Sequence, residues 1–407
     1  MKRTAEVTPT STPSKIKPWA DAIERTPEKN RGPPLVLKAS PTKQMVKRNT
    51  RSDAIKTYVF FDLECTGLFP KTDKRDWARV SETSDEYREQ LENKCIHTRT
   101  DEFPFITEMS FCAISRETFD ELKQERMDIV KWNEEHPDQK KQLATFIPTN
   151  THTRQLNPDM TASQWKKYED NRRGREDKLV HVRRQAERNN TFDKEWPSVI
   201  DFLDSLQKPA LLIGHNCLEY DLRVIYGEIS RYKLLANFGI PKDIFFMDSF
   251  LMAKYVDANL ERELITVCKY INFRKIPAKE DNDEFVIQDS QESTIQQDIP
   301  PIREPTIING VPARDHPVNF LDYDQFPVVF RKRIRNENFS RTPSGGWTYR
   351  NSENMRHGLE LLYHELVGGE YNAHFAQPDA EALLQVCLSY GDEFSKFGDT
   401  FAAAIPF

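Results

Sequence analysis

The chain has 407 residues and a formal net charge of −6, with 38% hydrophobic and 30% charged residues. This balance predicts one globular core with polar excursions, and it excludes a wholly basic nucleic-acid coat, although an enzyme needs only a local basic groove. No segment approaches the roughly 20 consecutive apolar residues of a membrane span, and the N-terminal residues lack the apolar region of a signal peptide. We therefore expect a soluble, unsecreted protein without a membrane partner.

The six cysteines are scattered along the chain and form no C-x-x-C pair. Four of them lie inside apolar runs, which is typical of reduced core thiols in an intracellular protein. They are Cys65, Cys95, Cys112, Cys217, Cys268 and Cys387.

Residues 1–56 are rich in Pro, Ser, Thr, Lys and Arg and poor in bulky apolar side chains, which predicts a disordered basic tail. The pattern Ser/Thr-Pro-x-Lys occurs there three times, beginning at Thr12, Thr26 and Ser40. It resembles the acceptor site of proline-directed, cyclin-dependent kinases, so these residues are candidate phosphorylation sites and such a kinase is a candidate partner. The alternative is that a Pro- and Ser-rich tail produces such tetrapeptides by chance.

The first ordered elements are expected to be strands. Apolar runs at Tyr58–Phe61 and Met109–Ile114 predict two of them, and a third is expected within residues 145–156. Residues 71–104, between the first two strands, are almost wholly charged or polar and predict an insertion on the surface.

A helix dense in charged residues is predicted over Trp165–Asn190. Its arginines make it the most basic folded stretch, and they serve either as a solvated helix face or as a phosphate-binding surface. They are Arg172, Arg173, Arg175, Arg183, Arg184 and Arg188.

Strands and helices alternate in the second half of the chain, which predicts an α/β domain over residues 57–391. A long, mostly irregular insertion is expected over residues 275–352, where no sustained period is present, and residues 392–407 are expected to form a C-terminal tail. The expected strands are Ala210–Gly214 and Ile244–Met247, and the expected helices are Trp196–Leu206, one from Tyr220, one opening at Asp248-Ser249, one near Met355–Val367 and one from about Pro378 to Tyr390.

Two acids, Asp62 and Glu64, follow directly on the apolar run of the first strand. Because strand side chains alternate, both carboxylates point to the same face. They repel each other and lose hydration unless a cation lies between them, and a hard divalent ion such as Mg²⁺ would remove that cost. The alternative is a structural pair satisfied by hydrogen bonds.

Two further acids begin apolar helix faces. Asp221 precedes Val224 and Ile225 on the helix after the HN turn, where it is either a functional acid or an N-cap. Asp379 begins the last apolar stripe, and His374 stands five residues before it. Imidazole titrates near neutrality, so His374 is a candidate general base for a hydrolysis. Together the four acids suit a two-metal site for phosphoryl displacement.

In chain order, FFDLECTGL, HNCLEYD and HFAQPD resemble the three exonuclease motifs of the DEDDh branch of the 3′→5′ exonucleases. This ribonuclease H-like group includes the proofreading subunit of bacterial replicases. Within it, FPFITEMSFCAI and IFFMDSFLMAK resemble the second strand and a helix start of the TREX (three-prime repair exonuclease) proteins. The resemblance covers residues 57–70 and, discontinuously, 105–391.

The resemblance implies a ribonuclease H-like exonuclease fold, a central mixed sheet flanked by helices. It also implies that two Mg²⁺ ions, with Mn²⁺ as a substitute, bind at Asp62, Glu64, Asp221 and Asp379, with Asp62 bridging. His374 would deprotonate the attacking water, and Leu68 and Tyr220 would hold the terminal base and sugar. The alternative interpretation of Leu68 is that it is a core leucine.

Three features depart from the family pattern. Cys65 stands where members usually carry Thr or Ala, a small change that should preserve activity but add sensitivity to oxidation or soft metals. The two insertions are longer than expected for a TREX protein, which puts substrate range and homodimer formation in doubt. The chain also ends soon after the last expected helix, without the hydrophobic anchor of the membrane-bound TREX form.

The expected function is a 3′→5′ exodeoxyribonuclease that removes 5′-mononucleotides from single-stranded or frayed DNA 3′ ends, in DNA repair or degradation. The alternatives are an exoribonuclease of the same branch and a catalytically inactive nucleic-acid-binding scaffold, which would be expected to have lost an acid or the histidine. The basic clusters Lys47-Arg48 and Arg331–Arg335, with the kinase-like sites, slightly favour the nucleus over the cytoplasm.

Overall fold

The computed structural model describes residues 54–69, 78–96, 103–144, 147–172, 183–274 and 357–407, with short segments at 307–308, 311–312, 317, 333–334 and 338–350. All of these belong to one compact unit, residues 38–407. The candidate phosphorylation sites Thr12, Thr26 and Ser40 and the Lys47-Arg48 cluster lie outside the described residues.

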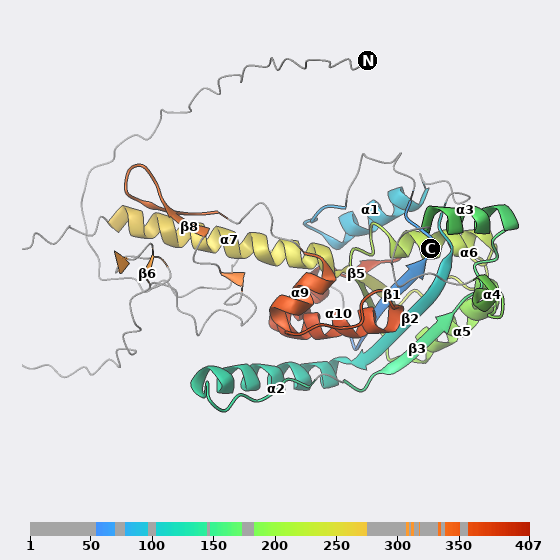
Figure 1. Ribbon diagram of the computed structural model, residues 1–407, viewed down its shortest axis with the longest axis horizontal. Coiled ribbons are helices and arrows are strands. Elements are labelled where there is room, and N and C mark those ends of the chain that lie inside the picture. Colours follow the sequence, from blue (N-terminus) through green and yellow to red (C-terminus); the bar gives the residue numbers. More distant parts are fainter. Residues whose placement is uncertain are drawn as a thin grey trace, which may run out of the picture. The chain divides into compact units, whose positions relative to one another are not determined.

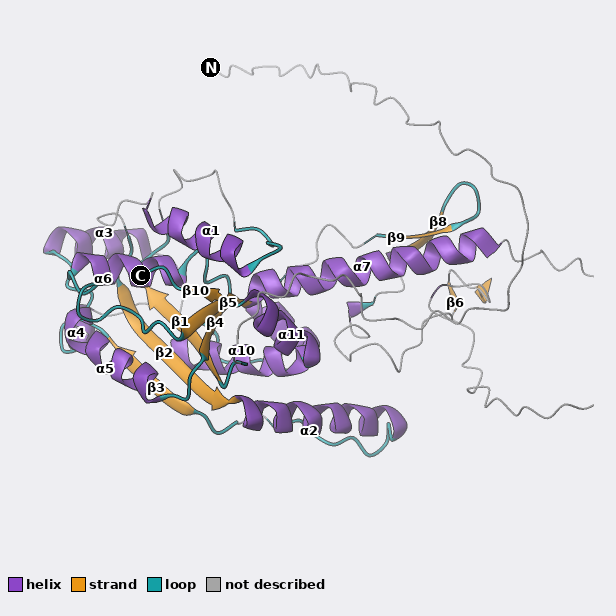
Figure 2. Cartoon of the chain, turned by 180° about the vertical axis from the view of Figure 1, so that it is seen from behind, coloured by secondary structure: helices purple, strands orange, loops and turns teal. Residues whose placement is uncertain are grey.

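A mixed six-stranded sheet forms the centre of the unit, with strand order β10-β5-β4-β1-β2-β3 (Figures 1 and 2). β2 is antiparallel to both β1 and β3, whereas β4 and β5 are parallel to β1 and β10 is antiparallel to β5. The predicted α/β class is confirmed. The strands are β1 (Thr57–Cys65), β2 (Ile106–Ser115), β3 (Asn150–Gln155), β4 (Ala210–Gly214), β5 (Ile244–Asp248) and β10 (Ala403–Ala404).

Helices flank the sheet, and two small hairpins lie in the segment between residues 307 and 350. Among the described helices, none is both long enough and apolar enough to cross a membrane. The helices are α1 (Ser84–Ile96), α2 (Arg116–Glu135), α3 (Ala162–Arg172), α4 (Arg183–Ala186), α5 (Phe192–Ser205), α6 (Asp221–Arg231), α7 (Ser249–Arg274), α9 (Leu359–Leu366), α10 (Ala376–Tyr390) and α11 (Asp392–Phe401); the hairpins are β6 (Ile307–Ile308) with β7 (Val311–Pro312) and β8 (Phe339–Arg341) with β9 (Trp347–Tyr349).

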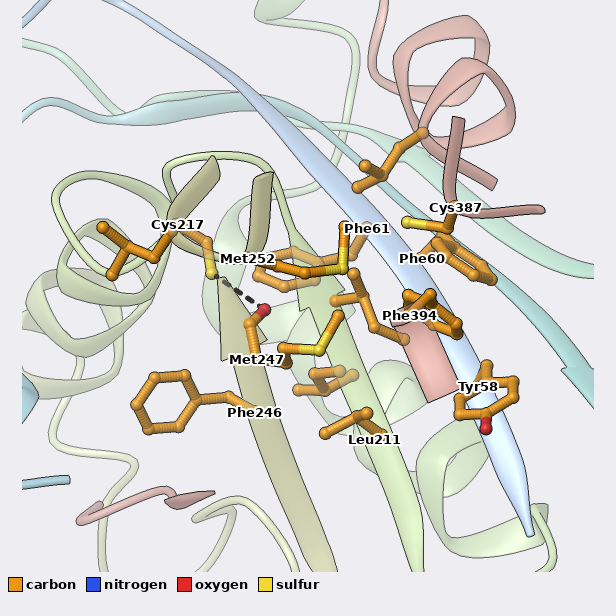
Figure 3. Packing of buried hydrophobic residues seen from close by; sticks show 14 of the residues in the cluster. Tyr58, Phe60, Phe61, Leu211, Cys217, Phe246, Met247, Met252, Cys387 and Phe394 are labelled. Atoms are coloured by element: carbon orange, nitrogen blue, oxygen red, sulfur yellow. Dashed lines mark hydrogen bonds between the residues drawn. The ribbon is translucent and has the colours of Figure 1, made fainter. Parts of the chain in front are cut away.

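The alternation of β1 places Tyr58 and Phe60 on one face of the sheet, where both rings contact Phe119 of α2 and Phe394 of α11. Figure 3 shows Cys387 of α10 close to Phe60 on this face. Asp62 and Glu64 continue the same alternation, so they lie on the face of β1 that carries the packed rings of Tyr58 and Phe60.

The expectation of a wholly superficial insertion over residues 71–104 is wrong. α1 lies within it and buries Tyr87, Leu91 and Cys95 in the core. These side chains recur every four residues, so they form one helix face despite the charged composition around them.

The expectation of a tail over residues 392–407 is also wrong. Phe394, Phe397 and Phe401 of α11 are buried, and β10 then pairs with β5 to complete the sheet. The three phenylalanines stand at i, i+3 and i+7, which is the spacing of the apolar face of an amphipathic helix. The 20-residue helix α2 was not predicted either.

The basic helix predicted over Trp165–Asn190 is replaced by two shorter helices, α3 and α4, with residues 173–182 outside the described part. Trp165, Tyr168 and Ala186 form a small separate apolar cluster. Arg183 agrees with the solvated-face interpretation, because it is exposed and its Nε lies 2.7 Å from Glu187 Oε1. Arg184 and Arg188 are also exposed.

Much of the 275–352 insertion lies outside the described residues, but its described parts are ordered. The β8–β9 hairpin packs on α7, where the amide of Asn272 donates to the Trp347 carbonyl at 2.8 Å and accepts from the Trp347 N–H at 2.6 Å. Arg333, at the centre of the basic cluster 331–335, is buried. The central arginine of that cluster is therefore not accessible for a role in nuclear import.

Candidate metal centre

At the end of β1 that carries the acids, one side of the strand is not paired with a neighbouring strand. β1 pairs with β2 along its whole length, with an irregularity between Glu64 and Cys65, but it pairs with β4 only as far as Phe60. The backbone groups of residues 61–65 on that side therefore need partners from another element.

Asp221, the first residue of α6, occupies this edge. Its buried carboxylate lies close enough to the backbone of Leu63, between the two acids of β1, for that backbone to lower its pKa. Burial, together with the charges of Asp248 and Asp379, raises the pKa of Asp221 to about 7. Because β4 stops pairing with β1 at Phe60, Asp221 can lie beside Asp62 and Glu64.

Asp248 at the end of β5 holds the loop that leads into α6. Its carboxylate accepts the N–H groups of Asn216 at 3.1 Å and Leu218 at 3.0 Å. It also accepts the N–H of Phe250 at 2.9 Å, at the start of α7. Asp248 is therefore an anchor for the HNCLEYD segment, and burial raises its pKa to about 6 despite these bonds.

Asp379 comes to the same place from α10, which packs along β1 and β2 (Figure 1). One carboxylate oxygen of each of Asp62, Glu64 and Asp379 lies within 4.8 Å of the other two. Asp221 is not part of this group of three, although it is its electrostatic neighbour. The Asp379 carboxylate accepts the Tyr371 hydroxyl at 2.7 Å and the His374 N–H at 2.8 Å.

The charges of these acids oppose one another. Burial and the charges of Asp221, Asp379 and Glu64 raise the pKa of Asp62 well above its ordinary value of 3.8. The pKa of Asp379 is raised as well, chiefly by burial. A divalent cation would relieve both the repulsion and the lost hydration, and a set of carboxylate oxygens alone matches the preference of Mg²⁺ and Mn²⁺. The donor set therefore fits the ions that the resemblance implies.

Two residues near the acids were not predicted. Glu108 of β2 lies directly opposite Glu64 in the ladder, is buried, and has a pKa raised by burial and by the charge of Asp379. Tyr371 precedes α10 and orients Asp379 through its hydroxyl. Glu108 is the one charged residue of β2, but no second acid in that strand marked it as part of a site, and no sequence pattern marked Tyr371.

His374 is joined to the centre by its backbone rather than by its ring. Its N–H donates to Asp379, and its φ of 68° lies in the left-handed region. The imidazole is 63% exposed, and its Nε2 lies 3.4 Å from Glu360 Oε1 of α9. In this conformation the ring faces Glu360.

The loop after β1 presents Leu68 to solvent. Leu68 is 83% exposed, which excludes the interpretation as a core leucine. Its neighbours are fixed, because the Tyr220 hydroxyl donates to the Gly67 carbonyl and the Tyr220 ring contacts Phe69 with centroids 5.3 Å apart. The Tyr220 side chain thus holds the loop that carries Leu68.

Cys65 is the last residue of β1, directly before this loop, and all six cysteines are free. Burial raises the pKa of the Cys65 thiol well above its usual range, so the thiol is protonated at neutral pH. A protonated thiol reacts more slowly than a thiolate, so the Cys65 thiol should be of low reactivity in the metal-free chain.

Comparison with protein-family models found no match for this chain, and comparison with curated proteins found none either.

Proposed function

We propose that the protein is a metal-dependent 3′→5′ exonuclease of the DEDDh type with a ribonuclease H-like fold. The observation that carries the proposal is the convergence of carboxylates from three elements, β1, α6 and α10, with three of them within 4.8 Å of one another. The motifs that resemble the DEDDh pattern supply the same residues. The mixed sheet flanked by helices agrees with the fold that this resemblance implies.

In this proposal Asp62, Glu64, Asp221 and Asp379 would hold two Mg²⁺ or Mn²⁺ ions. When bound, the ions would neutralise charge on the phosphodiester and on the attacking and leaving oxygens. The chain's own contribution is to fix the carboxylates. Tyr371 donates a hydrogen bond to Asp379, and the packing of Tyr58 and Phe60 against Phe119 and Phe394 fixes the strand that carries Asp62 and Glu64.

His374 would take the proton from the attacking water. Its backbone is held to Asp379 while its ring is exposed, so the ring would exchange Glu360 for the water when substrate binds. The product would be a 5′-mononucleotide.

The proposed substrate is the 3′ end of single-stranded or frayed DNA. The exposed Leu68, in the loop that Tyr220 anchors, offers an apolar contact to an unpaired terminal base, and such contacts tolerate any base. An exoribonuclease is the second candidate, because the motifs do not specify contacts to a 2′-hydroxyl.

The test is release of nucleotides from 3′-labelled single-stranded DNA and from RNA of matched sequence. We expect release with Mg²⁺ and none with EDTA. Asp62→Asn and His374→Ala should lower the rate by at least about 100-fold, as expected when a metal ligand or a general base is removed. Glu89→Gln is the matched control, because Glu89 is exposed on α1 and its loss removes the same charge.

Activity that survives both Asp62→Asn and His374→Ala would contradict the site assignment. Faster release from RNA than from DNA would favour the exoribonuclease. Binding of DNA without turnover in the wild-type protein would favour the inactive nucleic-acid-binding scaffold.

A further inference from the structure

Arg333 is a buried cation from the 275–352 insertion. It is only 2% exposed, and it forms a two-point ion pair with Asp257 of α7, with Nε 2.8 Å from Oδ1 and Nη2 2.6 Å from Oδ2. Its third nitrogen, Nη1, lies 2.9 Å from Glu365 Oε2 of α9. A buried charge must be fully paired, so this arginine ties α7 to α9.

The other end of α9 is tied to the same aspartate. His357, just before the N-cap Gly358, places Nε2 2.6 Å from Asp257 Oδ2. The His357 carbonyl accepts from His215 Nε2 at 2.7 Å, in the loop that leads to α6. Arg333 and Asp257 therefore hold α9 at both ends against the core.

α9 in turn reaches the candidate centre through two contacts. Glu360 lies 3.4 Å from the His374 ring, and the ring of Tyr363 packs on Tyr371 with centroids 4.8 Å apart. Tyr371 donates to Asp379. A shift of α9 would thus displace both the proposed general base, His374, and a proposed metal ligand, Asp379.

We propose that Arg333 is a positioning residue, through which the 275–352 insertion sets the place of α9 and, by way of Glu360 and Tyr363, the orientation of His374 and Asp379. The inference deepens the proposed exonuclease function and rests on it for its effect on rate. Arginine suits this position because its planar fork binds one carboxylate at two points and still offers a donor to a second, which lysine does not.

The test compares Arg333→Lys with Arg116→Lys. Arg116 forms a similar two-point pair with Asp399, at 2.7 and 2.8 Å, at the opposite end of β1 from the acids. On single-stranded DNA with Mg²⁺ we expect Arg333→Lys to lower kcat by about tenfold or more with KM nearly unchanged, because displacements of about 1 Å can cost about 100-fold. Arg116→Lys should leave kcat unchanged.

A double-mutant cycle separates positioning from general destabilisation. If Arg333 acts through α9, its substitution should have a smaller effect in a Glu360→Gln background than in the wild type. Equal effects in both backgrounds would overturn the route through Glu360. Glu365→Gln, which weakens only the link to α9, is the milder variant to use if Arg333→Lys fails to fold.

Hydrogen–deuterium exchange tests the docking without relying on activity. In metal-free protein, Arg333→Lys or Glu365→Gln should speed exchange of the amides of α9, whereas Arg116→Lys should not. Unchanged exchange in α9 together with unchanged kcat would overturn the inference. A wild-type protein that releases no nucleotide would contradict the proposed function alone, since the exchange measurement would still decide whether Arg333 holds α9.

Discussion

The Asp379 carboxylate is held from two sides, by the Tyr371 hydroxyl and by the His374 N–H. Hydrogen bonds of this kind orient a metal ligand and commonly matter nearly as much as the ligand itself. The tyrosine is in turn packed against Tyr363 of α9.

Replacing Tyr371 by Phe should therefore weaken metal binding without unfolding the protein. The ring remains to pack on Tyr363, while Asp379 loses one donor. We expect the Mg²⁺ concentration for half-maximal nucleotide release to rise by about 10-fold to 100-fold. Tyr363→Phe keeps the ring contact and serves as the control, and equal metal dependence in both variants would contradict the role of the Tyr371 hydroxyl.

The sequence predicts the residues at this scale when their signal is local. Asp62 and Glu64 are two apart on an apolar strand, and Asp379 begins an apolar helix stripe, so each is conspicuous by its spacing. Glu108 has no such partner in its own strand. Its neighbour Glu64 lies across the ladder, and the register that brings them together is decided by the pairing of the whole strands.

Among the elements, α11 makes the largest difference between expectation and structure. Phe394 is fully buried, with ring centroids 5.0 Å from Tyr58, 6.0 Å from Phe60 and 4.9 Å from Phe119. The helix thus completes the apolar face of β1 on which the acids stand.

Phe394→Ala should lower the free energy of unfolding by about 3–5 kcal/mol, the usual cost of removing a buried phenylalanine ring. Urea denaturation followed by circular dichroism measures it. Phe273→Ala is the control, because Phe273 is 92% exposed on α7 and its loss should change stability by less than about 0.5 kcal/mol. A loss of stability as small as that of the control would mean that α11 does not support the core.

The central strands are predictable because they are short continuous apolar runs between turns. α1 and α11 are harder, since their apolar side chains are few and stand among charged residues. Both do carry helical spacing, Tyr87, Leu91 and Cys95 in one and Phe394, Phe397 and Phe401 in the other. The two-residue strand β10 has no sequence signal of its own and forms because β5 offers it a free edge.

At the scale of the described unit, the acids make stability depend on pH and on metal. Asp221 has a pKa of about 7 in the folded chain against an ordinary 3.8. A carboxyl whose pKa is raised on folding holds its proton more tightly when folded, so its contribution to stability is lost as pH rises between these two values.

In metal-free protein we therefore expect the free energy of unfolding to fall, by on the order of a few kcal/mol from this group, as pH rises from about 4 to about 7. The free energy of unfolding of the Asp221→Asn variant should fall less steeply over the same pH range. Thermal unfolding in EDTA at pH 5, 6, 7 and 8 compares the two, and identical profiles would contradict the assignment.

Mg²⁺ should raise the melting temperature of the wild type more at pH 8 than at pH 5, because protons compete with the ion for the same oxygens. Asp221→Asn should show a smaller rise at pH 8. The same measurement with Glu89→Gln should match the wild type.

The order of the acids along the chain has a consequence for synthesis. Asp62 and Glu64 are made early, but Asp379 belongs to α10, and α11 and β10, which close the sheet, follow it. A growing chain that has not yet released α10 from the ribosome holds an incomplete set of carboxylates on an unfinished sheet. In the proposed exonuclease, hydrolytic competence would require that the chain be made at least through β10, so a chain that stops before α10 could not attack nucleic acid.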